Sequence, residues 1–107
     1  MKRIVWVGSS RRDLKGFPGD ARREAGYQLE RLQAGLRPND WKPLAAAGPG
    51  VEEIRIHAGN EYRVLYIARY EEAVYVLHCF AKKTRKTPPR EIMIARTRLK
   101  QVTAARG

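Results

Sequence analysis

The sequence has few of the residues from which disulfide and metal sites are built. Its single cysteine, Cys79, excludes an intramolecular disulfide and a cysteine metal cluster. Cys79 lies in the apolar stretch VYVLHCFA, so a buried and unreactive thiol is expected. The two histidines, His57 and His78, have no metal-ligand spacing to each other or to Cys79. We therefore expect no metal and no other cofactor.

Long apolar runs are also absent. No stretch approaches the roughly 18 apolar residues that cross a membrane. The N-terminal run, residues 4–7, is shorter than the roughly 7 to 15 residues of a signal peptide's apolar region. A cytoplasmic protein without a membrane partner is the expectation, and the length of 107 residues predicts one small domain over residues 1–107.

The common motifs of covalent catalysis are missing too. The chain has no glycine-rich phosphate loop, no G-x-S-x-G and no pairing of a cysteine nucleophile with a histidine base. Hydrolysis through a nucleophile of the enzyme is therefore disfavoured.

Acidic residues are half as frequent as basic ones, with 11 Asp+Glu against 22 Lys+Arg and a formal net charge of +11. The excess is greatest after residue 81, where nine basic residues accompany one acid, Glu91. Such a charge is informative about partners rather than about the fold. RNA or DNA is the polyanion expected, and a merely solubilising basic surface is the alternative.

Apolar spacing predicts an α+β fold with the order β-α-α-β-β-β-α. Period-two runs indicate a small, mainly antiparallel sheet with helices packed on one face. The last helix should expose Arg96, Arg98 and Lys100. The elements expected are a strand at 3–7, a short helix from Ser10, a helix from about 18–20 to Gly35, a turn-rich connector at 37–50, strands at 51–57, 61–70 and 73–83, and a helix at about 90–103.

Charged residues recur with strand spacing in this meander. Residues two apart share a face, so Glu53, Arg55 and His57 lie opposite the apolar face of their strand. Arg63 lies in the middle of the next strand, where an unpaired guanidinium is costly. It either forms an ion pair with Glu53 across the hairpin or joins Arg55, Lys82 and Lys83 in an anion-binding face.

Clustered cations without a metal or a nucleophile can still act on RNA. They bind a phosphodiester and stabilise the charge that develops as the neighbouring 2′-hydroxyl attacks, provided that another group transfers protons. His57 is a candidate for that role, although an exposed loop histidine fits equally well. His78, between Leu77 and Cys79, is expected to be a buried histidine with its hydrogen bonds satisfied.

A family resemblance rests on the order of several short strings: DLKGFP, LQAG, KPL, GPGVEEIRI, EYRVLYIA, VYVLHCFAKKTRKTP and EIMIARTR. Together they resemble the phage-derived Gp49-like, or HigB, branch of the RelE/ParE toxin superfamily over nearly the whole chain. The resemblance implies a RelE-like microbial ribonuclease fold, a helix-turn-helix antitoxin encoded beside the toxin, and cleavage of mRNA in the ribosomal A site. It places the active-site cations at Arg55, Arg63 and Lys83 or its neighbour Lys82.

The chain departs from RelE-type relatives in one respect. Those relatives use a tyrosine of the C-terminal segment for proton transfer, and no tyrosine follows Tyr75 here. His57, Glu53 and the lysines are the groups that could replace it. Related ParE-like toxins share the fold but bind gyrase and cut no RNA.

The leading hypothesis is therefore a type II toxin that is a metal-independent, ribosome-dependent endoribonuclease. Its predicted catalytic residues are Arg55, His57, Arg63 and Lys83. Adjacent lysines on a strand point to opposite sides, so only one of Lys82 and Lys83 faces the site, and Lys83 is the one predicted. The alternative is a non-catalytic toxin or phage accessory protein that binds a protein target or nucleic acid. The predicted RNA-binding residues are Lys82, Arg85, Lys86 and Arg90.

Overall fold

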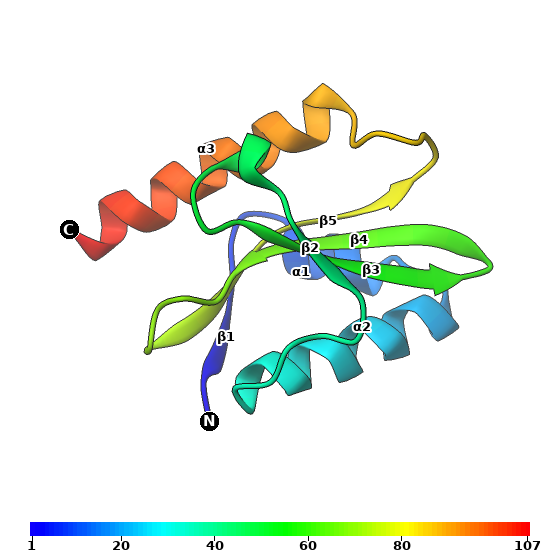
Figure 1. The fold of residues 1–107 in the computed structure, drawn as a ribbon, viewed down its shortest axis with the longest axis horizontal. Coiled ribbons are helices and arrows are strands. Elements are labelled where there is room, and N and C mark those ends of the chain that lie inside the picture. The colour runs from blue at the N-terminus through cyan, green and yellow to red at the C-terminus, as the bar shows by residue number, and fades with distance from the viewer.

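A computed structural model describes all residues, 1–107. It has a five-stranded sheet, three α-helices and one 3₁₀ turn, η1 (Figure 1). No helix is both long and apolar enough to cross a membrane. In chain order the elements are β1 (Arg3–Trp6), α1 (Ser10–Lys15), α2 (Gly19–Gln33), β2 (Trp41–Pro43), η1 (Ala45–Ala47), β3 (Glu52–Ala58), β4 (Asn60–Ile67), β5 (Ala73–Lys82) and α3 (Pro89–Arg106).

The sheet confirms the predicted α+β class and the antiparallel meander. Its strand order is β1-β5-β4-β3-β2, and only the β1–β5 pair is parallel. The β3–β4 hairpin turns at Gly59, whose φ of 79° suits glycine because other residues rarely adopt it. The register between β4 and β5 shifts at Leu65/Tyr66, which marks a β-bulge. This bulge decides where the lysines at the end of β5 lie.

The prediction that all helices pack on one face is wrong. Helices α1 and α2 cover one face of the sheet, with Ala25 and Leu29 against Ile54 and Val64. Helix α3 covers the other face, and Figure 1 shows it across the sheet from α2. The central strands cause this arrangement, because β4 and β5 are apolar on both sides and each side needs a cover.

The connector between α2 and β3 contains structure that the prediction lacked. Its three residues of β2 pair with β3 at the edge of the sheet, with Trp41 opposite Ile54. A strand this short shows no periodicity, and Pro43 is tolerated because an edge strand needs only one partner. The consequence is that Asp40, just before β2, lies beside β3.

Helix α3 is attached through Arg98, which was predicted to face solvent. Its guanidinium donates to the carbonyl of Leu77 at 2.9 Å and to the hydroxyl of Ser9 at 2.9 Å. Ser9 in turn donates to Asp13 at 2.7 Å. Arg98 therefore connects α3 to β5 and α1. Arg96 and Lys100 are exposed as predicted.

The contact between α3 and η1 gives a test of this layering. Gly48 has a φ of 129°, and a Cβ there would lie 2.4 Å from Cδ2 of Leu99. We predict that Gly48→Ala lowers the free energy of unfolding, measured in urea, by about 1–3 kcal/mol, because the new methyl group overpacks the site and strains the backbone.

The matched control is Gly26→Ala in α2, where no atom lies within 4 Å of the added Cβ. This substitution should raise stability by up to about 1 kcal/mol, because alanine favours helix over glycine. Equal effects of the two substitutions would contradict the packing of α3 against η1.

Candidate active site

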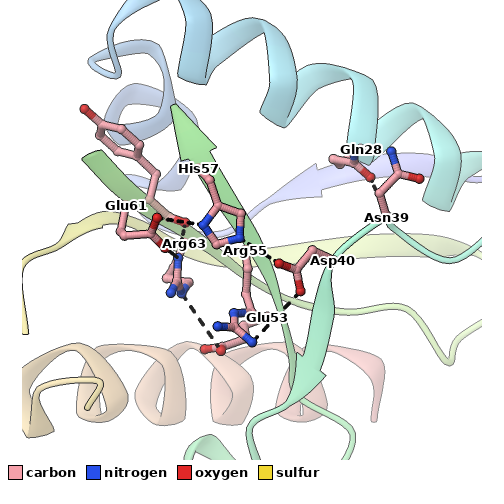
Figure 2. Close-up of polar contacts among 9 residues, drawn as sticks. Gln28, Asn39, Asp40, Glu53, Arg55, His57, Glu61 and Arg63 are labelled. Atoms are coloured by element: carbon pink, nitrogen blue, oxygen red, sulfur yellow. Dashed lines mark hydrogen bonds and ion pairs between the residues drawn. The ribbon is translucent and has the colours of Figure 1, made fainter. Parts of the chain in front are cut away.

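Two arginines face each other across the central hairpin. In the register of β3 and β4, Arg55 lies directly opposite Arg63. Like charges in this position destabilise a sheet unless other groups compensate them. Carboxylates from Asp40, Glu53 and Glu61 surround the pair, and Figure 2 shows the connected contacts.

Arg63 is almost fully enclosed, with a side chain 3% exposed. Its Nη1 donates to Glu61 at 3.0 Å and to the carbonyl of Tyr62 at 2.9 Å. The predicted ion pair with Glu53 is present as a longer contact of 4.0 Å from Nε. Glu61, on the same strand, is thus the closer partner, and it provides the charge that a buried guanidinium requires.

Arg55 is more accessible, with 28% of its side chain exposed, and its Nη1 lies 4.0 Å from Asp40. The backbone fixes this neighbour, because the N–H of Arg55 donates to the carbonyl of Asp40 at 2.9 Å. Gln28 of α2 accepts a hydrogen bond from the N–H of Asn39 at 2.8 Å and holds the same turn. Asp40 was not among the site residues predicted from the sequence. The only signal was an Asn-Asp turn before an aromatic residue.

His57 lies between two carboxylates. Its Nδ1 is 2.6 Å from Glu61 and its Nε2 is 2.7 Å from Asp40. The hydrogen bond to Asp40, followed by that to Glu61, raises the pKa of His57 above its ordinary value. The hydrogen bond from His57 lowers the pKa of Asp40 and also that of Glu61. The geometry thus favours an imidazolium, which can give up a proton but cannot accept one.

This network still has unused hydrogen-bonding capacity. Buried polar atoms normally have partners. Here Oε2 of Glu53, Nε of Arg55 and Nε of Arg63 are buried without a partner in the chain. No group of three His, Cys, Asp or Glu side chains is arranged to hold a metal ion. The unpartnered N–H groups of the arginines are donors suited to an anion, and the imidazole of His57 can carry a proton.

The β-bulge places Lys82, rather than the predicted Lys83, on the face of Arg63. In the register of β4 and β5, Lys82 lies opposite Glu61, and β5 ends at this residue. Lys83 lies just beyond the end of the strand and is exposed. The four predicted RNA-binding side chains form no ion pair within the chain. Lys82 ends β5, Arg85 and Lys86 lie in the exposed connection to α3, and Arg90 lies in the first turn of α3.

The remaining predicted groups are structural. His78 is buried as predicted, and its Nε2 lies 2.8 Å from Glu91 in the first turn of α3. Its Nδ1 is buried without a partner in the chain, so the prediction that both ring nitrogens are satisfied holds only for Nε2. Its ring stacks on Phe80 at 5.1 Å between centroids. Cys79 is buried, and this burial raises the pKa of its thiol, so the thiolate is disfavoured.

The fold and this charged face define a small α+β domain with paired arginines on an antiparallel meander, the class expected of RelE/HigB-like toxins. Residues 12–100 match the model of a family described as "Phage derived protein Gp49-like (DUF891)". The chain belongs to this Gp49-like family, a RelE/HigB-like toxin branch. Membership in this family suggests that the protein is the toxin of a toxin–antitoxin system, and it implies an antitoxin partner. A search of curated proteins found no match.

The contacts of His57 predict its titration. By NMR, the imidazole should titrate above the ordinary histidine pKa of about 6.5, and Asp40→Asn should lower the midpoint because it removes the larger of the two causes. Asp20→Asn, at an exposed site on α2, is the control and should change nothing. An unchanged midpoint in Asp40→Asn would contradict the arrangement.

The same contacts set the pH dependence of stability. Because the folded protein raises the pKa of His57, its stabilising effect is complete below the unfolded pKa and is lost as pH rises through the folded pKa. His57→Gln should therefore cost more stability near pH 6 than near pH 9. Both carboxylates have lowered pKa values, so their contribution is lost only as pH falls through those values.

Proposed function

We propose that the protein is a toxin that inhibits translation as a ribosome-dependent, metal-independent mRNA endonuclease. The observation that supports this function best is the convergence of Arg55, Arg63 and a doubly bonded His57 on one face of β3 and β4. Lys82 extends the same face on β5. Cations and a proton donor are the groups required when RNA supplies its own nucleophile.

In this reaction the 2′-hydroxyl of RNA gives up its proton to water and forms a bond to the adjacent phosphorus as the bond to the 5′-oxygen breaks. Arg55 is the more exposed arginine and binds the phosphate directly, with Arg63 behind it. Fixed donors aimed at developing charge are worth about 3–4 kcal/mol each in enclosed sites. The imidazolium of His57 supplies the proton that the leaving 5′-oxygen takes up.

The partners in this proposal follow from the unpaired charge and from the family. Lys82, Arg85, Lys86 and Arg90 hold the RNA backbone of messenger or ribosome. A helix-turn-helix antitoxin, encoded beside the toxin, neutralises it. The site of action is the cytoplasm, where translation takes place.

A second function is favoured by the enclosure of Arg63. Its charge is already balanced by Glu61 and only 3% of its side chain is exposed, as in a purely structural ion pair. In that case the chain is a toxin that binds a protein target and cuts no RNA. Primer extension on a translated reporter separates the two, since an endonuclease leaves codon-positioned breaks and a binder leaves none.

The proposed catalytic roles of Arg55 and His57 predict that replacing either residue slows mRNA cleavage. Arg55→Ala and His57→Gln should each slow mRNA cleavage by about 10²- to 10⁴-fold, because one removes charge stabilisation and the other proton transfer. Lys100→Ala, an exposed site on α3, is the control and should cleave normally. Circular dichroism verifies that each variant is folded. Cleavage at the normal rate in both site variants would remove these roles.

The two lysines at the end of β5 give a separate test. Lys82→Ala should reduce cleavage more than Lys83→Ala, because the register places only Lys82 on the face of Arg63. The two substitutions change net charge equally, so each controls for the other. A larger effect at Lys83 would show that the end of β5 rearranges on the ribosome.

A further inference from the structure

A groove of about 1090 Å³ lies along the outer edge of β5. Strand β1 pairs with β5 only as far as Val76, so the last six of the ten residues of β5 have no neighbouring strand on this side. The groove is bordered by the end of β5, the corner between α1 and α2, and the tip of the β3–β4 hairpin. Its volume lies just above the roughly 300–1,000 Å³ typical of small-molecule sites, so it has room for more than a small ligand.

Three cations line this groove: Arg12 of α1, Lys82 and Lys83. None of them forms an ion pair or donates a side-chain hydrogen bond within the chain. Their charges are therefore available to a ligand, whereas those of Arg63 and His57 are balanced. Arg12 was not among the site residues predicted from the sequence.

The two acids of the groove do not cancel this charge. Glu61 is engaged by Arg63 and His57, at 3.0 and 2.6 Å. Asp13 accepts from Ser9, which is itself bonded to Arg98. The groove thus presents a positive potential to an incoming anion.

The groove is continuous with the candidate active site. Glu61 belongs to both, because it contacts His57 and Arg63 and also lines the groove. Lys82 lines the groove and lies opposite Glu61 in the sheet. A polymer whose reacting phosphate lies at Arg55 can thus continue past the hairpin tip toward α1. Phe17 and Tyr62 give this path an apolar floor.

We propose that this groove binds single-stranded RNA next to the cleaved phosphate, with Arg12 as a phosphate-binding residue; this inference rests on the proposed endonuclease function. A flexible polyanion fits a groove with separated cations and an apolar floor, since single strands bind through backbone charge and base contacts together. The unpaired edge of β5 adds backbone donors. An acidic peptide is the competing occupant, and the test includes it.

The test compares two charge reversals on one helix. Arg12→Glu and Arg11→Glu change net charge equally, both positions are exposed, and only Arg12 lines the groove. Binding of a labelled single-stranded oligoribonucleotide to the full-length protein is measured by fluorescence anisotropy across a salt series. Arg12→Glu should weaken binding about tenfold or more and reduce the salt dependence, while Arg11→Glu should change affinity less than about twofold.

Each alternative outcome is decisive. If the two variants change RNA affinity equally, or if neither changes it, the proposal that the groove binds RNA is wrong. If Arg12→Glu binds RNA normally but no longer copurifies with the adjacently encoded antitoxin, the groove is a peptide site and the RNA assignment is wrong. If the wild-type protein binds RNA and Arg12→Glu weakens that binding, but no mRNA breaks are found, the endonuclease function is rejected and RNA binding in the groove stands. If mRNA breaks are found but Arg12→Glu does not weaken RNA binding, RNA binding in the groove is rejected and the endonuclease function stands.

Discussion

The opposition of Arg55 and Arg63 across β3 and β4 is the constraint around which this face of the protein is organised. Two guanidinium groups at adjacent positions repel each other, and one of them is nearly excluded from water. Three carboxylates resolve the conflict, and each comes from a different place: Glu53 from β3, Glu61 from β4 and Asp40 from the turn before β2. The short edge strand β2 is thus part of the site, because it fixes Asp40.

One consequence is that the paired cations of the network and the unpaired cations elsewhere on the protein differ in their electrostatic effect. With His57 protonated, the network contains three positive and three negative groups, so it contributes little to the long-range field. The attraction for a polyanion comes instead from the unpaired lysines and arginines at the end of β5 and beyond. Paired cations have fixed positions and suit a reacting phosphate, whereas unpaired cations suit capture of a flexible chain.

The sequence was sufficient for whatever depends on local periodicity. Alternation in residues 51–82 predicted the meander and placed Arg55, His57 and Arg63 on one face, as observed. Asp40 could not be found in this way, because three residues of β2 have no period and their pairing is a long-range contact. The prediction also placed α3 on the wrong face of the sheet. Both faces of β4 and β5 are apolar, so a helix is needed on each face.

The lysine pair shows how one residue can reverse a prediction. Val74 and Val76 face α2, and strict alternation would continue that phase to Lys82 and leave Lys83 on the site face. The bulge inserts an extra residue, Leu77, which faces α3, and Phe80 then follows on the same side. Every residue of β5 after the bulge therefore lies on the face opposite to the one that strict alternation predicts. Lys82 thus lies on the same face of the sheet as Arg63.

The bulge also joins the two charged regions into one surface. With Lys82 in this phase, a free cation lies opposite Glu61, the carboxylate that holds both Arg63 and His57. Lys82 is thus the residue at which the unpaired cations of β5 adjoin the paired charges of β3 and β4. Without the bulge that position would lie on the other face of the sheet, and the two charged regions would be separated.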